Sequence, residues 1–346
     1  MFDQLLLSCV PLATAQETPL LISTDLATAC LARHWGLQGI LSRLDGEQDA
    51  NFRVRTGDRD GYVLKIVHRG CPPDSVDFQA AALAQLQPLG LNLPQVIKNC
   101  AGETRTSVDI NGEIRQAWLL RWCPGTLLAE HAPLSADLVR SFGFLLARVT
   151  DGLAGFEHPA MRRGHRWELS RAAHITPLLA AIEGEAAPLA GAALAAFQTF
   201  ALPHLESLPW GVVHNDANDY NVLVEGDRVT GLIDFGDMSW QPIICDVAIA
   251  LAYLILDREE PLAVCADFLR AYAAQHPLRE EELDILFELI RARLAVSLAI
   301  SSHRQKLEPD DPYITISQAP VRRALLTLAR YSRDEVSATF RRAAGL

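Results

Sequence analysis

His214-Asn215-Asp216-Ala217-Asn218-Asp219-Tyr220-Asn221 is the stretch that decides the fold, and Ile233-Asp234-Phe235-Gly236-Asp237 follows it closely. Asp234 stands 13 positions after Asn221. Together the two stretches supply a candidate general base, Asp216, and two oxygen ligands for a hard metal ion, Asn221 and Asp234. Phosphoryl transfer from a nucleotide to a hydroxyl group needs these three groups. The base accepts the hydroxyl proton, and the other two side chains hold Mg²⁺ on the phosphates.

A polar turn between two strands is the alternative explanation for the first stretch taken alone. The second stretch argues against it, because Gly231-Leu232-Ile233 has the pattern of a strand that ends in an acid, and Gly236 frees the chain to turn. We expect His214 to hold the loop by hydrogen bonds, and Asp246 to be a structural cap beside it. The two stretches contain two further acids, Asp219 and Asp237. They either position a second metal or meet a substrate ammonium, or they are solvated loop charges.

The composition is that of an ordinary globular protein with room for two lobes: 346 residues, 49% apolar and 21% charged. The net charge of −11, from 31 basic and 42 acidic residues, argues against nucleic acid or an anionic membrane as a partner. It suits a cationic or zwitterionic small molecule better. Seven widely spaced cysteines without a CxxC pair predict free thiols and a cytoplasmic location. We expect neither a signal peptide nor a membrane span, because no uncharged apolar run reaches about 18 residues.

The residue pattern changes at Cys123-Pro124-Gly125, from short strand-like runs to long Ala/Leu-rich segments. This change predicts an α+β fold with two lobes, 1–121 and 122–346. The first lobe should be an antiparallel sheet with one inserted helix: strands 51–56, 62–68, 104–109 and 117–122, and helix 75–89. A capped helix should precede it after Ser23. The second lobe should be mostly helical, with short strands only around the polar stretches. Its predicted helices are 135–153, 167–183, 187–207, 243–257, 261–275, 279–305 and 318–345, and its strands are 211–213, 222–224 and 229–233.

Lys65 lies in the strand-like run Val63-Leu64-Lys65-Ile66-Val67, one of only three lysines in the chain. Alternation with period two puts it on one face with Val63. If that face lines the cleft between the lobes, Lys65 reaches the nucleotide phosphates; the alternative is an edge lysine that extends to water. Asp77, on the inserted helix, is the expected partner of Lys65, unless it is a solvated first-turn acid.

The turn before the first clear strand, 44–52, contains one glycine, so it is not a G-x-G-x-x-G loop. No GxxxxGK[ST] motif occurs. We expect phosphate contacts from backbone N–H groups of a tight turn around Gln48 to Ala50. Asp49 and Asn51 should brace that turn through their own backbone; direct contact with the ligand is the alternative. Backbone groups near Arg121 and Trp122 should bind the purine edge, without a preference between ATP and GTP.

These motifs resemble the aminoglycoside phosphotransferase and choline kinase superfamily, which has a protein-kinase-like fold. The resemblance covers roughly residues 20–330 and rests on Lys65, His214-x-Asp216-x₄-Asn221 and Asp234-Phe235-Gly236. It implies a kinase with nucleotide and Mg²⁺ between the lobes. Two departures are Asp77, where the family usually has Glu, and Glu168, where the related pattern often has Asp.

A narrower similarity is to hydroxylysine kinase and to the kinase-like domain fused to certain class III aminotransferases. It is carried by four stretches: Glu47-Gln48-Asp49-Ala50-Asn51-Phe52, His158-Pro159-Ala160-Met161-Arg162-Arg163, Trp167-Glu168-Leu169 and His214-Asn215-Asp216-Ala217-Asn218-Asp219-Tyr220-Asn221. It implies a small hydroxylated amine or amino acid as the acceptor. From the residues alone, Arg162, Arg163 and Arg166 are a solvated basic patch, whereas the resemblance implies that one of them meets a substrate carboxylate.

Other acceptors remain open: homoserine, choline or ethanolamine, or an aminoglycoside. A nucleotide-binding pseudokinase without turnover is the alternative outside enzymes. The complete set of Asp216, Asn221 and Asp234 argues against it. The sequence does not predict the oligomeric state.

Overall fold

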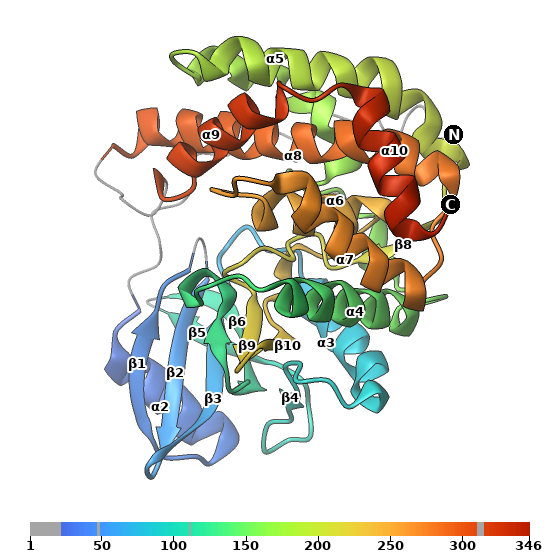
Figure 1. Ribbon diagram of the computed structural model, residues 1–346. Coiled ribbons are helices and arrows are strands. Elements are labelled where there is room, and N and C mark those ends of the chain that lie inside the picture. Colours follow the sequence, from blue (N-terminus) through green and yellow to red (C-terminus); the bar gives the residue numbers. More distant parts are fainter. Residues whose placement is uncertain (1–21, 47–48, 111, 310–314) are drawn as a thin grey trace.

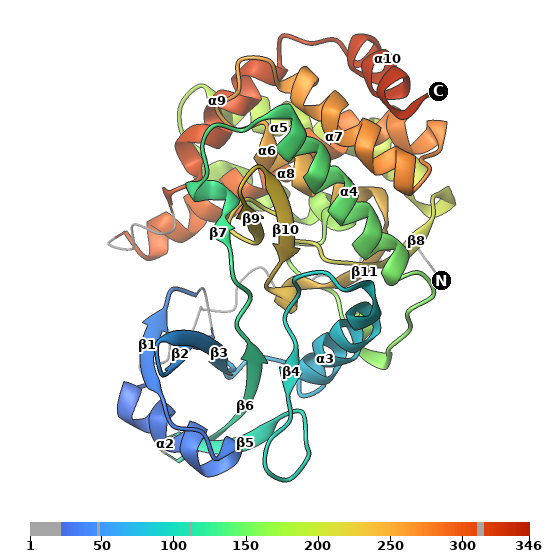
Figure 2. The same ribbon diagram turned by 60° about the horizontal axis from the view of Figure 1, so that its bottom comes forward.

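The computed structural model describes residues 22–46, 49–110, 112–309 and 315–346 (Figure 1). An antiparallel sheet with helix α2 lies at one end of the molecule, and most helices are gathered at the other end (Figures 1 and 2). Short strands from the middle of the chain lie between them. This is the predicted two-lobed α+β arrangement.

The sheet at the N-terminal end has the order β1-β2-β3-β6-β4, with β5 also paired to β6, and all pairs are antiparallel. Helix α2 covers it: Ser23 caps the helix by accepting a hydrogen bond from Leu26 N, and Gly36 ends it at φ 64°. The elements are α2 (Thr24–Trp35), β1 (Ile40–Leu44), β2 (Ala50–Thr56), β3 (Arg59–Ile66), β4 (Val96–Ile97), β5 (Thr106–Ile110) and β6 (Glu113–Arg121).

Helix α3 (Ser75–Leu86) is inserted between β3 and β4, and a short 3₁₀ turn, η1 (Gln87–Leu89), follows it. Its buried side chains belong to the larger core of the molecule, with Phe78 and Leu83 in one cluster with Phe142 and Leu146 of α4. The sheet and α2 have a separate smaller core. Helix α3 is therefore tied to the helical region as well as to the sheet.

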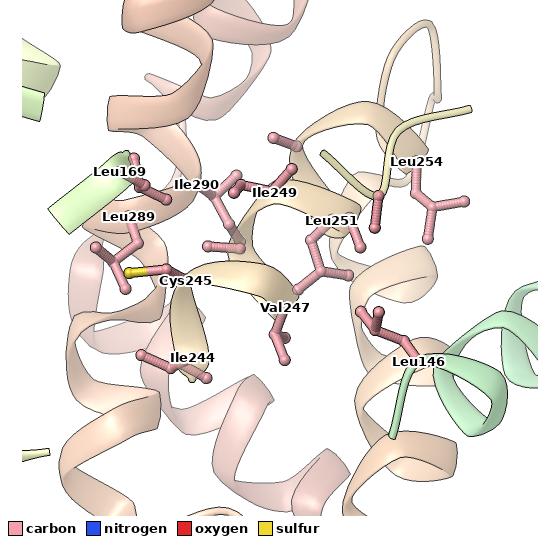
Figure 3. Close-up of a cluster of buried hydrophobic side chains, with 14 of the residues drawn as sticks. Leu146, Leu169, Ile244, Cys245, Val247, Ile249, Leu251, Leu254, Leu289 and Ile290 are labelled. Carbon is pink, nitrogen blue, oxygen red and sulfur yellow. The ribbon is translucent and has the colours of Figure 1, made fainter. Parts of the chain in front are cut away.

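The helical region is built around α6 (Ile244–Leu254), whose side chains are nearly all buried. Figure 3 shows Cys245 of α6 beside Leu289 of α8, and Val247 on the side of α6 that faces Leu146 of α4. The α-helices around it are α4 (Ala136–Gly152), α5 (Ala186–Ala196), α7 (Pro261–Gln275), α8 (Glu280–Leu307), α9 (Gln318–Leu328) and α10 (Arg333–Ala344).

Two small antiparallel sheets lie between these regions and carry the polar stretches. One has the order β10-β9-β7, and the other pairs β11 with β8. Their strands are β7 (Thr126–Leu127), β8 (Trp210–Val213), β9 (Val222–Glu225), β10 (Arg228–Leu232) and β11 (Ser239–Pro242). The first polar stretch therefore connects strands of two different sheets, and the second follows β10.

Three of the predicted helices differ from the structure. The segment 167–183 is a kinked 3₁₀ run, η4 (Leu169–Ala181), with Pro177 inside it. The segment 187–207 is α-helical only as far as Ala196. A π turn, η5 (Phe197–Ala201), and a 3₁₀ turn, η6 (Leu202–Ser207), complete it, because Pro203 cannot continue the α-helical hydrogen bonds.

The third difference is the single predicted helix 318–345, which is two helices because Ser332 caps α10 by accepting from Glu335 N. Strands β1, β4, β7 and β11 were not predicted. Of these, β4 and β7 have two residues each, and β11 has four, of which one is proline.

The helical run Ala186–Ser207 is long and apolar enough to span a membrane by composition, although its α5 part packs on α8. The absence of a membrane span therefore stays a prediction.

Candidate active site

His214 holds the first polar stretch in place. Its side chain is fully buried, its Nε2 hydrogen-bonds Ile233 O at 3.0 Å, and its Nδ1 accepts from Asp216 N at 3.2 Å. The ring is therefore the neutral tautomer that carries its proton on Nε2. Burial lowers the pKa of His214, although Asp246 opposes this. The expected structural role of His214 agrees with this geometry.

Asp246 fixes the backbone of the same stretch. Its buried carboxylate accepts from His214 N at 3.2 Å and from Asn215 N at 2.8 Å. Asn215 has φ 67°, a left-handed conformation that this pair of bonds supports. Burial raises the pKa of Asp246, and His214 and the loop N–H groups oppose this. The expected cap is thus a cap of the loop, because both donors to the Asp246 carboxylate lie in the loop.

Asp216 accepts hydrogen bonds on both carboxylate oxygens. Asn218 Nδ2 and Arg293 Nη2 donate to Oδ1 at 2.9 and 3.1 Å, and Asn221 Nδ2 donates to Oδ2 at 2.7 Å. The side chain is 23% exposed, so one approach to the carboxylate stays open. Burial and the nearby Asp237 raise its pKa well above the usual range, against the opposing charge of Arg293. Asp216 is thus a fixed base with enhanced proton affinity.

Arg293, in the middle of α8, is the site residue that the sequence analysis missed. It is 2% exposed, and its guanidinium lies 5.0 Å from the Trp167 ring and 5.5 Å from the Tyr253 ring. Its Nη1 donates to Trp167 O at 3.3 Å, and its Nη2 donates to Asp216. The signal was an arginine within the apolar run Ala292–Ile300, where a buried charge requires a partner.

Asn221 and Asp234 are brought side by side by the backbone. Ile233 N donates to Asn221 O at 2.8 Å, so the residue after Ile233 lies next to Asn221. Asn221 uses its amide nitrogen on Asp216, which leaves its side-chain oxygen as the atom able to ligate a cation. Asp234 has φ 58° and accepts from Gly236 N at 3.3 Å.

Lys65 reaches this site from strand β3. It is 8% exposed, and its Nζ lies 3.1 Å from Asp234 Oδ1. Burial works against the ammonium charge, but Asp234 and Asp49 outweigh it and raise the pKa of Lys65. Lys65 in turn lowers the pKa of Asp234, although burial opposes this. Both side chains are therefore charged, and the structure joins the predicted lysine to the predicted metal ligand.

The expected partnership of Lys65 with Asp77 is wrong. Both carboxylate oxygens of Asp77 accept from Arg105, through Nε and Nη2 at 3.0 Å each. A bidentate arginine pair is the stronger arrangement, and it holds the acid away from the lysine. Lys65 pairs with Asp234 instead.

The remaining predicted nucleotide contacts have mixed outcomes. Gln48 lies outside the described residues. Asp49 braces the end of β3 by accepting from His68 N at 3.0 Å. The backbone N–H groups of Arg121 and Trp122 already donate to Gln95 O and Gly61 O, so these two donors are not available to a purine edge.

The arginines expected to form a solvated patch lie against other groups. The guanidinium of Arg162 stacks 3.5 Å from the centre of the Trp240 ring. Arg163 donates to Gly236 O at 2.8 Å. Asp237 pairs with His165 Nε2 at 3.2 Å, beside the loop. Buried Glu168, where the family often has Asp, pairs with Arg171 at 3.6 Å.

The fold and the site define a nucleotide-dependent phosphotransferase of the protein-kinase-like kind. The chain belongs to the phosphotransferase enzyme family, whose sequence model matches residues 40–283. It is 25% identical to hydroxylysine kinase of Danio rerio, over 94% of this chain and 96% of that protein. It is 31% identical to homoserine kinase of Methylobacillus flagellatus, over 71% of this chain and 72% of that protein.

Solved structures show the same fold. Amicoumacin kinase, in complex with AMP-PNP and Ca²⁺, matches with a TM-score of 0.69 at 13% identity, covering 90% of this chain and 95% of that one. A microcompartment-associated aminopropanol kinase matches with a TM-score of 0.67 at 18% identity, covering 93% and 98%. The resemblance drawn from the motifs is confirmed, and the chain is a small-molecule kinase that acts on a hydroxyl group.

Proposed function

We propose that this enzyme uses Mg²⁺ and ATP to phosphorylate the hydroxyl group of a small amino acid or amine, with hydroxylysine as the first candidate. The observation that carries the proposal is the convergence of Asp216, Asn221, Asp234 and Lys65 at one place, held by the hydrogen bonds described above. The similarity to hydroxylysine kinases over nearly the whole chain supports the acceptor class.

The metal fits this set of residues. Mg²⁺ is commonly held by one or two protein oxygens and completed by nucleotide phosphates and water. Asn221 and Asp234 supply such oxygens. The described part of the chain holds no group of three or more His, Cys, Asp or Glu side chains that could hold a metal ion. When bound, the ion would neutralise charge on the transferred phosphate.

The chain's own residues then have distinct tasks. Lys65 holds the phosphates with a charge that Asp234 keeps in place. The acceptor oxygen forms a bond to the γ-phosphorus while the bond from that phosphorus to the β–γ bridging oxygen breaks. Asp216 takes the acceptor proton, and its raised pKa makes it the stronger base for this step. The products are a phosphate ester and the nucleoside diphosphate.

The same surroundings suit an acceptor that carries an ammonium group. Asp237 lies beside Asp216, and Asp219 is in the same loop. The net charge of −11 favours approach of a cationic or zwitterionic molecule. Homoserine is the second candidate, because homoserine kinases are 28–31% identical to this chain.

The test is a panel assay. The wild type is incubated with Mg²⁺, ATP or GTP, and hydroxylysine, homoserine, ethanolamine, choline or an aminoglycoside, and phosphate transfer is measured. We expect transfer to hydroxylysine, and an Asp216→Ala variant should lose roughly 10²–10⁴-fold in kcat while it still binds nucleotide. Asp137→Asn, at an exposed carboxylate of α4, is the control.

Two results would contradict the proposal. Wild-type turnover in Asp216→Ala would remove Asp216 from its role. Metal-dependent nucleotide binding by the wild type without transfer to any acceptor would favour a pseudokinase.

A further inference from the structure

Helix α3 has no ion pair with the lysine of the sheet. Asp77, the acid in its first turn, is bound on both oxygens by Arg105, and Lys65 is bound to Asp234. Even so, the start of α3 lies next to the turn η7 (Phe235–Asp237) that follows Asp234. Apolar packing holds this helix in the larger core, and a different polar contact joins it to the turn.

Arg163 makes that contact. Its Nη1 donates to Ser75 Oγ, and its Nη2 donates to Gly236 O at 2.8 Å. Ser75 is the first residue of α3, and Gly236 donates its own N–H to the carboxylate of Asp234. One planar guanidinium thus joins the helix to the turn that carries the metal ligand.

The side chains around Arg163 fix its position. Its guanidinium lies 5.6 Å from the centre of the Phe78 ring, on the same helix α3. That ring stacks on Phe156 at a centroid distance of 6.0 Å and lies tilted against His158 at 5.3 Å, both in the segment that leads to Arg163. Gln79 also donates to Ser75 Oγ, at 3.4 Å. Arg163 is therefore held between an aromatic stack and a buried hydroxyl.

The partners of Arg163 indicate a positioning role. Both acceptors are neutral oxygens, and within the described ranges no carboxylate lies within 4.0 Å of its charged nitrogens. A surface ion pair could not explain such a geometry. Two directed hydrogen bonds to different elements are what is needed to set the distance between those elements.

We propose that Arg163 is a positioning residue that couples helix α3 to the Asp234-Phe235-Gly236 turn. It performs the task that a Lys65–Asp77 ion pair would otherwise perform. Through the turn it sets where Asp234 presents its carboxylate to the metal-bound phosphates. This inference rests on the proposed kinase function.

The kinetic test compares Arg163→Met with the wild type. We expect kcat to fall about 10–100-fold through misplacement of the phosphates, with the KM for the acceptor little changed. Arg163→Lys keeps the positive charge but has a single donor nitrogen in place of two, and it should recover part of the loss. Ser75→Ala should lose less, because the bond from Arg163 to Gly236 O remains. Its effect on kcat should be smaller in the Arg163→Met background than in the wild type, because the bond between Arg163 and Ser75 is already absent there.

Arg105→Met is the matched control, because it breaks the ion pair of Asp77 at the same end of the same helix. It should keep the wild-type kcat. If Arg105→Met loses as much as Arg163→Met, general loosening of α3 explains the effect and the proposal is overturned.

A second measurement does not need the acceptor. Amide hydrogen exchange is followed with Mg²⁺ and a non-hydrolysable ATP analogue. In the wild type the nucleotide should slow exchange in both 75–79 and 234–238; in Arg163→Met it should slow only the second segment. Unchanged protection of both segments in Arg163→Met would overturn the coupling. This result is independent of whether the wild type phosphorylates any acceptor, so failure of the proposed function would be seen separately.

Discussion

Removing the carboxylate of Asp246 should destabilise the protein and slow catalysis, although Asp246 touches neither the nucleotide nor the acceptor in the proposed reaction. In Asp246→Ala the N–H groups of His214 and Asn215 lose their acceptors at 3.2 and 2.8 Å. Each bond to a charged acceptor contributes about 1.5–3 kcal/mol, which gives a gross loss of roughly 3–6 kcal/mol. Removal of a buried carboxylate returns part of this, so we expect a net loss of about 2–4 kcal/mol.

The assay is thermal unfolding combined with turnover. For a chain of this size, 1 kcal/mol corresponds to about 2 °C, so Tm should fall by roughly 4–8 °C. Because Asn215 precedes the base directly and its φ of 67° is unsupported without Asp246, kcat should fall about 10–100-fold. Asp246→Asn keeps one acceptor oxygen, so its Tm and kcat should lie between those of the wild type and those of Asp246→Ala.

Asp137→Asn, at an exposed carboxylate in the first turn of α4, is the control for loss of charge. A Tm and kcat equal to the wild type in Asp246→Ala would refute the reasoning. They would mean that water can replace the carboxylate at the loop.

Three further changes test the packing and the site. Gly143→Ala should lower stability by about 1–3 kcal/mol, because the new Cβ would lie 2.3 Å from Phe268 O where α4 meets α7; unchanged Tm would contradict this packing. Gly191→Ala, in α5 with open space around it, is its matched opposite and should raise stability by about 0.5–1 kcal/mol in the same unfolding measurement. Arg293→Met should lower both Tm and kcat, because it leaves Asp216 beside other acids without its buried cation. Turnover within twofold of the wild type in a steady-state assay would show that the other two donors suffice to hold Asp216.

The residues that could be found from the sequence are those in short motifs. Asp216, Asn221 and Asp234 were placed because their spacing fixes them at the ends of neighbouring strands. Lys65 was placed because a lysine on a buried strand face needs an anion. Each of these inferences needs only a few neighbouring residues and the alternation of a strand.

Arg293, which was missed, and Arg163, which was expected in a solvated patch or on a substrate carboxylate, depend on contacts between distant segments. Arg293 meets Asp216 across 77 positions, and Arg163 meets Gly236 across 73. The residues next to each arginine in the sequence do not predict its hydrogen-bond partner. Asp77 was assigned to the wrong cation for the same reason, because Arg105 lies 28 positions further on and no local pattern connects them. The α-helices that end at Ala196 and Leu328 show a different limit, because the apolar periodicity of the sequence continues beyond the residue at which each helix ends.

The hydrogen bonds of the site imply that Asp216 and Asp234 depend differently on the position of the N-terminal sheet. Asp216 is held by Asn218 and Asn221 of its own loop and by Arg293 of α8, and none of these residues belongs to the N-terminal sheet. Its geometry therefore does not depend on where the sheet lies. Asp234 is bonded to Lys65 of the sheet, so a displacement of β3 changes the charge that faces the phosphates without moving the base.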